Sequence, residues 1–132
     1  MSEGPVPLDA AWLRAHPLPV HGDVDKNERG RVLLVGGSAR GPGGVRLTAE
    51  AAFQSGAGKV QLAVPDMLAI PLGVLLPEAG MFALPTDEAG EVAGTGPVEE
   101  LLDHCDCLAI GPAMGSADVA GRILDAILPR AN

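Results

Sequence analysis

Two short glycine-rich turns are the positions in this sequence best suited to bind a ligand. Each one follows an apolar run: residues 36–38 follow the run 31–35, and residues 111–115 follow the run 107–110. Glycine lets the backbone approach a ligand closely, and the free N–H groups of a helix that begins behind such a turn favour anions. The pattern therefore indicates a crevice for a nucleotide or a phosphorylated substrate. The alternative is a pair of tight strand-to-helix turns that bind nothing.

Other polar residues are weaker candidates for a site. His21, Asp23 and Lys26 precede the first apolar run and could reach a ligand, although a solvated loop is the simpler interpretation. Cys105 and Cys107 stand beside a histidine and an aspartate, but a zinc site needs about four ligands from two separated pairs. We therefore expect neither a metal site nor a catalytic cysteine here.

Two apparent nucleotide-binding motifs fail on inspection. Gly58 and the lysine after it match the end of a P-loop, but Phe53 replaces its first glycine and Val60 replaces the Ser/Thr that would bind magnesium. The tripeptide Gly-Thr-Gly at 94–96 is followed by Pro97, so it presents no carboxylate. Neither motif supplies a phosphate-activating group.

The elements that must position the glycine turns alternate between strands and helices. Continuous apolar, β-branched runs are typical of strands buried on both faces, and Ser116 is a suitable cap for the last helix. We expect strands at residues 31–35, 60–64, 81–84 and 107–110, and helices at 8–14, 43–55, 67–76, 98–103 and 116–128. This order predicts an α/β fold with three layers, a mostly parallel sheet and flanking helices. Residues 1–17 are interpreted as an N-terminal extension and 18–132 as the α/β unit.

Composition excludes several classes of function. The chain has 132 residues, with 9 lysines and arginines against 17 aspartates and glutamates, so its net charge is −8. Such an acidic chain lacks the basic stripe of a nucleic-acid binder. No apolar run reaches the ~18 residues that a membrane-spanning helix needs. Two cysteines do not make a disulfide framework, and no signal peptide is visible, so we expect a cytoplasmic location.

Several motifs together resemble the ADP- or ATP-dependent NAD(P)H-hydrate dehydratase family, whose members are ribokinase-like α/β proteins. The similarity extends from about Trp12 to the C-terminus. The segments that carry it are Gly30-Arg31-Val32-Leu33-Leu34-Val35-Gly36-Gly37-Ser38, Gly41-Pro42-Gly43-Gly44, Ala51-Ala52-Phe53-Gln54-Ser55-Gly56-Ala57-Gly58 and Ile110-Gly111-Pro112-Ala113-Met114-Gly115. The resemblance implies dehydration of hydrated NADH or NADPH, NAD(P)HX, with ADP or ATP and Mg²⁺.

The resemblance also implies which residues contact the substrate. Gly44 and Gly115 match the family's dinucleotide contacts, with Gly111 and Ser38 as residues that shape the site. The chain departs from the family pattern where Gly44 replaces an alanine and Ala113 replaces a glycine. Family members run to roughly twice this length, and their second half carries the nucleotide cradle and a catalytic aspartate in a Gly-Thr-Gly-Asp turn. The chain therefore looks like the truncated, first half of such an enzyme, with no catalytic residue of its own.

Three functional hypotheses remain open at this stage. The first is a dehydratase half that is inactive alone, and a second chain that restores activity would make it a split enzyme. The second is a non-catalytic nucleotide-binding or interaction protein, which pairs with another chain or a second copy through an exposed sheet edge. The third, a sugar or vitamin kinase relative, fits the glycine segments poorly.

Overall fold

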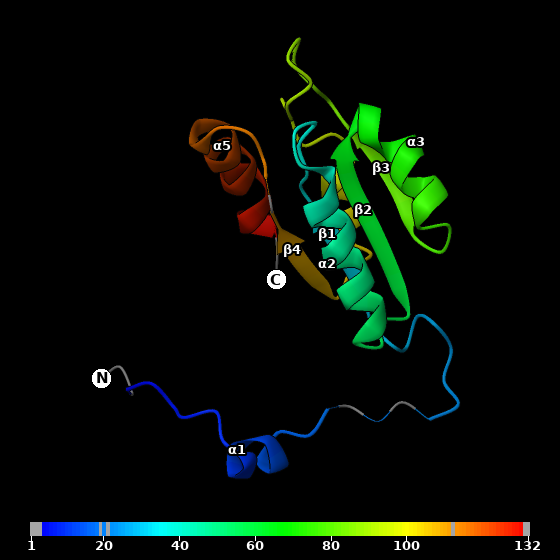
Figure 1. The fold of residues 1–132 in the computed structure, drawn as a ribbon, viewed down its shortest axis with the longest axis vertical. Helices are drawn as coiled ribbons and strands as arrows, with labels where there is room; N and C mark the ends of the chain where they lie inside the picture. Colours follow the sequence, from blue (N-terminus) through cyan, green and yellow to red (C-terminus); the bar gives the residue numbers. More distant parts are fainter. Residues whose placement is uncertain (1–3, 19, 21, 112, 131–132) are drawn as a thin grey trace.

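The computed structural model describes residues 4–18, 20, 22–111 and 113–130, and its centre is a four-stranded parallel sheet (Figure 1). The strands lie in the order β3-β2-β1-β4. In chain order the elements are α1 (Ala10–Ala15), β1 (Arg31–Val35), α2 (Pro42–Gln54), β2 (Lys59–Pro65), α3 (Asp66–Leu75), β3 (Gly80–Leu84), α4 (Val98–Leu102), β4 (Cys107–Ile110), α5 (Ala117–Ile127) and η1 (Leu128–Arg130).

The sequence predictions of element type are confirmed, with boundaries within about two residues. β1 lies in the middle of the sheet, where Val35 pairs with Ala63 of β2 and Ile110 of β4. A strand in this position is covered on both faces, so a continuous run of apolar residues is what it requires. The fold class expected from the sequence, an α/β unit with a parallel sheet, is therefore confirmed.

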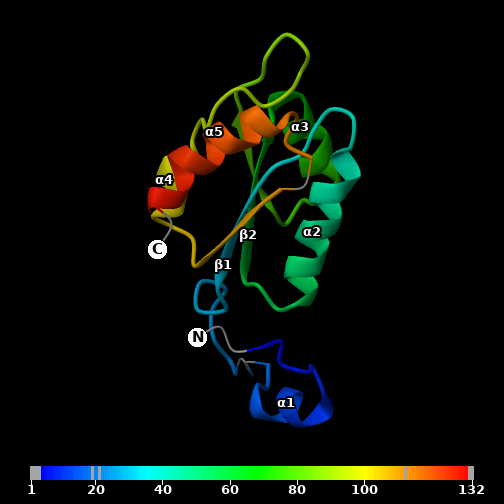
Figure 2. The ribbon, with the colours of Figure 1, turned by 90° about the vertical axis from the view of Figure 1, so that its left-hand side faces the viewer.

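Helices cover both faces of the sheet and make three layers (Figures 1 and 2). Leu34 of β1 packs with the buried faces of α2 and α3, where Val45 and Leu72 lie. Leu33, the next residue of β1, points the other way and packs with Ile123 and other buried residues of α4 and α5. The alternation of side chains along each strand thus supplies two cores, one on each side of the sheet.

Local signals explain where the helices begin and end. The side chain of Ser116 accepts a hydrogen bond from the N–H of Val119 at 3.4 Å, which caps the N-terminus of α5. Asp9 caps α1 in the same way, accepting from Ala11 and Trp12 at 2.9 and 2.8 Å. After α2 the chain turns at Gly56, whose φ of 97° is a conformation that favours glycine.

The segment before β1 lies apart from the sheet (Figures 1 and 2). Leu8 and Leu13 around α1 are 73% and 55% exposed, so this short helix has no core of its own. The chain joins the α/β unit at Lys26, whose carbonyl oxygen would lie only 1.8 Å from a Cβ placed on Gly58. Gly58 is therefore the residue that allows this segment to dock beside the start of β2.

Across the described residues, none of the helices combines the length and the apolar character that crossing a bilayer requires.

Candidate functional site

The two glycine turns meet at one edge of the sheet because β1 and β4 are parallel neighbours. The turn after β1 is shaped by Gly37, which has a φ of 97° and lies beneath α2. A Cβ at this position would come within 3.3 Å of Val45 Cγ1. Positive φ and close helix packing together explain why glycine stands at position 37.

A cavity of about 450 Å³ lies between these turns. It is lined by Ser38 and Arg40 of the first turn, by Ala113, Gly115 and Ser116 of the second, and by Glu91. Ser38 and Gly115, two of the four residues that the family resemblance singles out, therefore lie in the wall of the same cavity. Its volume falls within the range of small-molecule sites.

Ser38 is the most buried polar residue of this wall, with 5% of its surface exposed. Its hydroxyl donates to Glu91 Oε1 at 3.0 Å and accepts from the backbone N–H of Arg40 at 3.1 Å. Both hydrogen bonds hold the turn in a fixed shape. Ser38 thus orients Glu91 and positions the start of the loop toward α2.

Glu91 was not among the candidate residues predicted from the sequence. Asp87 organises the 87–91 loop by accepting from the N–H groups of Ala89 and Glu91 at 2.9 and 3.0 Å. Thr86 and Val92 form an antiparallel bridge, and Val92 is fully buried. The loop leaves β3 at one side of the sheet and folds back over the turn after β1. Glu91 could have been predicted only from the strand order, because the loops that follow the parallel strands β1 and β3 leave the same edge of the sheet.

The second turn has unusual backbone geometry. Gly111 has a φ of 105° and donates to the carbonyl of Val35 at 2.8 Å, while Gly115 has a φ of 76°. Ala113 also has a positive φ, 56°, at the position where the family pattern has glycine. Met114 is buried in the core below and anchors the turn. The turn is therefore strained at its one alanine.

The other two residues singled out by the resemblance lie near the cavity without lining it. Gly44 is in the first turn of α2, and its carbonyl accepts from Thr48 Oγ1 at 3.0 Å. Gly111 directly follows β4, two positions before Ala113 of the cavity wall. The geometry thus brings Ser38 and Gly115 to one cavity, whereas Gly44 and Gly111 do not line it.

The candidates that precede β1 lie at the opposite end of the sheet. Asp23 and Lys26 are exposed in the segment that leads into the strand, so they do not reach the cavity. His21 lies outside the described residues. These side chains were a weak hypothesis for ligand contacts, and the direction of β1 separates Asp23 and Lys26 from the glycine turns.

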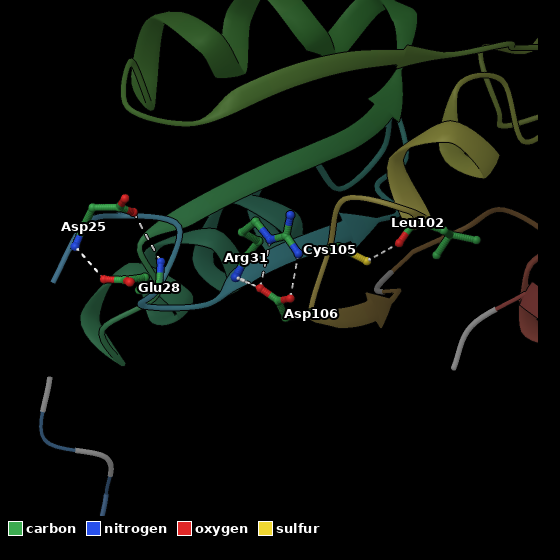
Figure 3. Close-up of polar contacts among 6 residues, drawn as sticks. All are labelled: Asp25, Glu28, Arg31, Leu102, Cys105 and Asp106. Carbon is green, nitrogen blue, oxygen red and sulfur yellow. Dashed lines mark hydrogen bonds and ion pairs between the residues drawn. The ribbon is translucent and has the colours of Figure 1, made fainter.

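The same end of the sheet holds an ion pair that joins β1 to the start of β4 (Figure 3). Asp106 accepts from the Arg31 guanidinium at 2.8 and 3.0 Å and from the Arg31 backbone N–H at 2.8 Å. These hydrogen bonds lower the pKa of Asp106 to about 2. Burial raises the pKa of the neighbouring Cys105 thiol. Cys105 and Cys107 are both free, and Asp106 has a structural role.

Metal-binding chemistry has no assembled site in the part of the chain that the structure describes. Within these residues, no three His, Cys, Asp or Glu side chains come together as a metal site would require. The cavity instead combines one carboxylate, one guanidinium and several backbone groups, which suits a polar organic ligand.

Comparison with known proteins identifies the family. The family model described as NAD(P)H-hydrate dehydratase matches residues 32–132, which include both glycine turns and, apart from the first residue of β1, the four strands of the described sheet. The chain belongs to this family. The family resemblance that the sequence motifs indicated is therefore confirmed.

Two curated relatives show the extent of the similarity. An ADP-dependent (S)-NAD(P)H-hydrate dehydratase of Xanthomonas campestris is 42% identical over 125 residues, covering 94% of this chain and 43% of the relative. A bifunctional NAD(P)H-hydrate repair enzyme of Moorella thermoacetica is 35% identical over 125 residues, covering 93% of this chain and 24% of the relative. The chain thus spans less than half the length of either relative.

Solved structures agree on the fold. A ribokinase-like superfamily protein of Enterococcus faecalis superimposes with a TM-score of 0.68 at 27% identity, covering 86% of this chain and 37% of that one. A Streptococcus mutans protein gives the same TM-score at 28% identity, covering 85% and 38%. The ribokinase-like fold that the resemblance implied is confirmed for the part of the fold that this chain spans.

Proposed function

We propose that this chain provides the dinucleotide-binding part of an enzyme that dehydrates NAD(P)HX to NAD(P)H with ADP or ATP. The observation that carries this proposal is the cavity between the two glycine turns, with Ser38 and Gly115 in its wall. Relatives named for NAD(P)H-hydrate dehydration or repair share 42% and 35% of their aligned residues with this chain. The overall reaction removes water and is that of a lyase.

The chain's own groups bind and orient the substrate in this proposal. The first turn of α2 begins at Gly41, which has no side chain to cap it, so the N–H groups of Gly43 and Gly44 are available to a phosphate oxygen. Gly115 lets the ligand approach the backbone, and Gly111 and Ser38 hold the two turns in place. Arg40 adds a positive charge at the same wall.

The chain does not itself supply a magnesium site or a catalytic acid in this proposal. The described residues bring together no acidic cluster for Mg²⁺, so we assign no step of the reaction to the metal here. The Gly-Thr-Gly tripeptide at 94–96 leads into Pro97, the N-cap of α4, rather than into an aspartate. We therefore expect the chain to be inactive alone, with ADP or ATP bound mainly by another polypeptide segment.

The topology indicates where such a segment would pair. Chain connections from β1 to β3 run through α2 and α3 on one face, and the return to β4 runs through α4 on the other. α5 follows β4 on this second face (Figure 2). Crossovers between parallel strands are right-handed, so the next strand belongs on the outer side of β4. Within the described residues β4 pairs only with β1, which leaves that edge available to a second chain.

The proposed setting is the cytoplasm. Reduced thiols are typical of that compartment, and Cys105 and Cys107 are both free cysteines. The substrate is a soluble dinucleotide, and the chain offers neither a basic surface for nucleic acid nor a bilayer-spanning helix in its described part.

Calorimetric titration with hydrated NADH, beside a turnover assay with ADP or ATP and Mg²⁺, tests the proposal. We expect binding without turnover by the pure chain. We also expect turnover to appear when a polypeptide corresponding to the remaining part of the Xanthomonas relative is added. Turnover by the pure chain would refute its inactivity, and absence of dinucleotide binding by the folded chain would refute the function.

A matched pair of variants makes the binding test specific. Gly115→Ala places a methyl group at the cavity wall, whereas Gly121→Ala adds the same atom on α5, where nothing lies within 4 Å. Only the first substitution should weaken dinucleotide binding. Tight binding that never yields turnover, with or without the second polypeptide, would favour a non-catalytic binding protein instead.

A further inference from the structure

Glu91 has a carboxylate oxygen that the fold leaves without a partner. Oε1 accepts from the Ser38 hydroxyl, but Oε2 is buried and has no hydrogen bond to any of the described residues. It lies against the second glycine turn, where a Cβ placed on Gly115 would be 3.3 Å away. A carboxylate oxygen in this state is unusual, because buried polar atoms are nearly always hydrogen-bonded.

Glu91 lies where a ligand in the cavity could donate a hydrogen bond to this oxygen. The residue lines the cavity together with both glycine turns. The terminal carboxylate torsion is soft, so a small rotation can open Oε2 to the cavity, and the Ser38 hydroxyl can rotate to keep its hydrogen bond to Oε1. Leaving a buried acceptor unsatisfied costs free energy, and a ligand that brings a donor recovers it.

The charge of Glu91 restricts what kind of group that donor belongs to. An ionised carboxylate only accepts hydrogen bonds, and it repels phosphate oxygens. Phosphate groups are favoured instead beside the guanidinium of Arg40, which also lines the cavity. The cavity wall therefore carries one side chain suited to an anionic group, Arg40, and one suited to an uncharged donor, Glu91.

We propose that Glu91 is a specificity-determining residue, whose carboxylate accepts a hydrogen bond from an uncharged hydroxyl or amide donor of the bound dinucleotide. This inference rests on the proposed function, because it assigns a role within the same cavity. A ribose hydroxyl and the carboxamide of the nicotinamide ring both have the required chemistry. Glu91 in this role orients the ligand with its phosphates away from the 87–91 loop.

Titration calorimetry on the full chain tests the inference with two Glu91 variants and one control. We expect Glu91→Gln and Glu91→Ala to weaken NADH binding about tenfold or more, the usual effect of losing a hydrogen bond to a charged group. Glu88→Gln removes an exposed charge from the same loop and should leave the affinity unchanged. Inorganic pyrophosphate, which offers no uncharged donor, should bind the Glu91 variants as well as or better than the original chain.

Two further ligands identify the donor. The reduced 3-acetylpyridine analogue of NADH has no carboxamide N–H, and ADP-ribose has no nicotinamide but keeps its ribose hydroxyls. If the tenfold loss is absent with the acetylpyridine analogue, the donor is the carboxamide. If it persists with both ligands, the donor is a ribose hydroxyl, and either pattern supports the inference.

The outcomes that overturn the inference are distinct from those that overturn the function. If the original chain binds NADH and the Glu91 variants bind it within twofold of Glu88→Gln, Glu91 has no such role. Equal weakening of NADH and pyrophosphate would indicate a collapsed cavity and would also refute it. If the folded original chain binds no dinucleotide at all, the proposed function fails, and the role of Glu91 fails with it.

Discussion

Replacing Gly115 by alanine tests how strongly the second glycine turn depends on its backbone geometry. Gly115 has a φ of 76°, a region that costs residues with a Cβ roughly 1–2 kcal/mol. The new methyl would also lie 3.3 Å from Glu91 Oε2, closer than ordinary van der Waals contact, so the Glu91 side chain must shift by a few tenths of an ångström. Together we expect a loss of about 2 kcal/mol in the free energy of unfolding.

The matched substitution Gly121→Ala should have the opposite sign. Gly121 lies inside α5, and nothing is within 4 Å of the position that its Cβ would take. Alanine favours a helix over glycine by roughly 0.5–1 kcal/mol, so this variant should be more stable than the original chain. The two variants add the same single carbon atom and differ only in the backbone that receives it.

Equilibrium urea denaturation followed by circular dichroism measures both effects. The two unfolding free energies should differ by about 3 kcal/mol, taking the 2 kcal/mol loss and the helix gain together. Gly111→Ala tests the effect of a positive φ without a close contact, because the φ of Gly111 is 105° and a Cβ there would meet nothing within 4 Å. The reasoning is refuted if Gly115→Ala changes stability by less than 0.5 kcal/mol or in the same direction as Gly121→Ala.

Three other substitutions have defined expectations. Ala113→Gly should raise the unfolding free energy by roughly 0.5–1 kcal/mol, because it relieves a φ of 56°; an unchanged urea midpoint would contradict the strain. Asp106→Asn should lower stability above pH 5, where the pair with Arg31 is intact. The pKa of Asp106 is about 2 in the folded chain and 3.8 ordinarily, so this stabilisation is lost as pH falls from about 4 to 2. If the variant is still clearly less stable than the original chain at pH 2, the ion pair is not the cause. Ile70 and Val74 of α3 are 80% and 76% exposed, so we expect the chain to self-associate through this helix. Ile70→Gln with Val74→Gln should reduce the association in sedimentation experiments, and an original chain that is monomeric would contradict this expectation.

The sequence was most informative where a signal is local. The run 31–35 predicts its strand because a buried strand requires uninterrupted apolar residues. Ser116 and Gly56 mark helix ends because each meets a requirement of the backbone at its own position. The family motifs likewise predicted a site at the two glycine turns, and Ser38 and Gly115 of these turns line one cavity.

Residues that depend on distant parts of the chain were not predicted. Glu91 reaches Ser38 across 53 positions, because the loop after β3 folds over the turn after β1. Asp106 was considered only as a neighbour of two cysteines, although its partner is Arg31. Both pairs follow from the strand order, and strand order depends on packing between segments rather than on any local pattern.

The ion pair between Arg31 and Asp106 also has a consequence for the order of folding. It joins residues 75 positions apart, whereas β1, β2 and β3 pair across the shorter spans of α2 and α3. Closing a long loop costs more chain entropy before any contact repays it, so β4 should dock last. Amide hydrogens of β4, an edge strand of the described sheet, should then exchange with solvent earlier than those of β2.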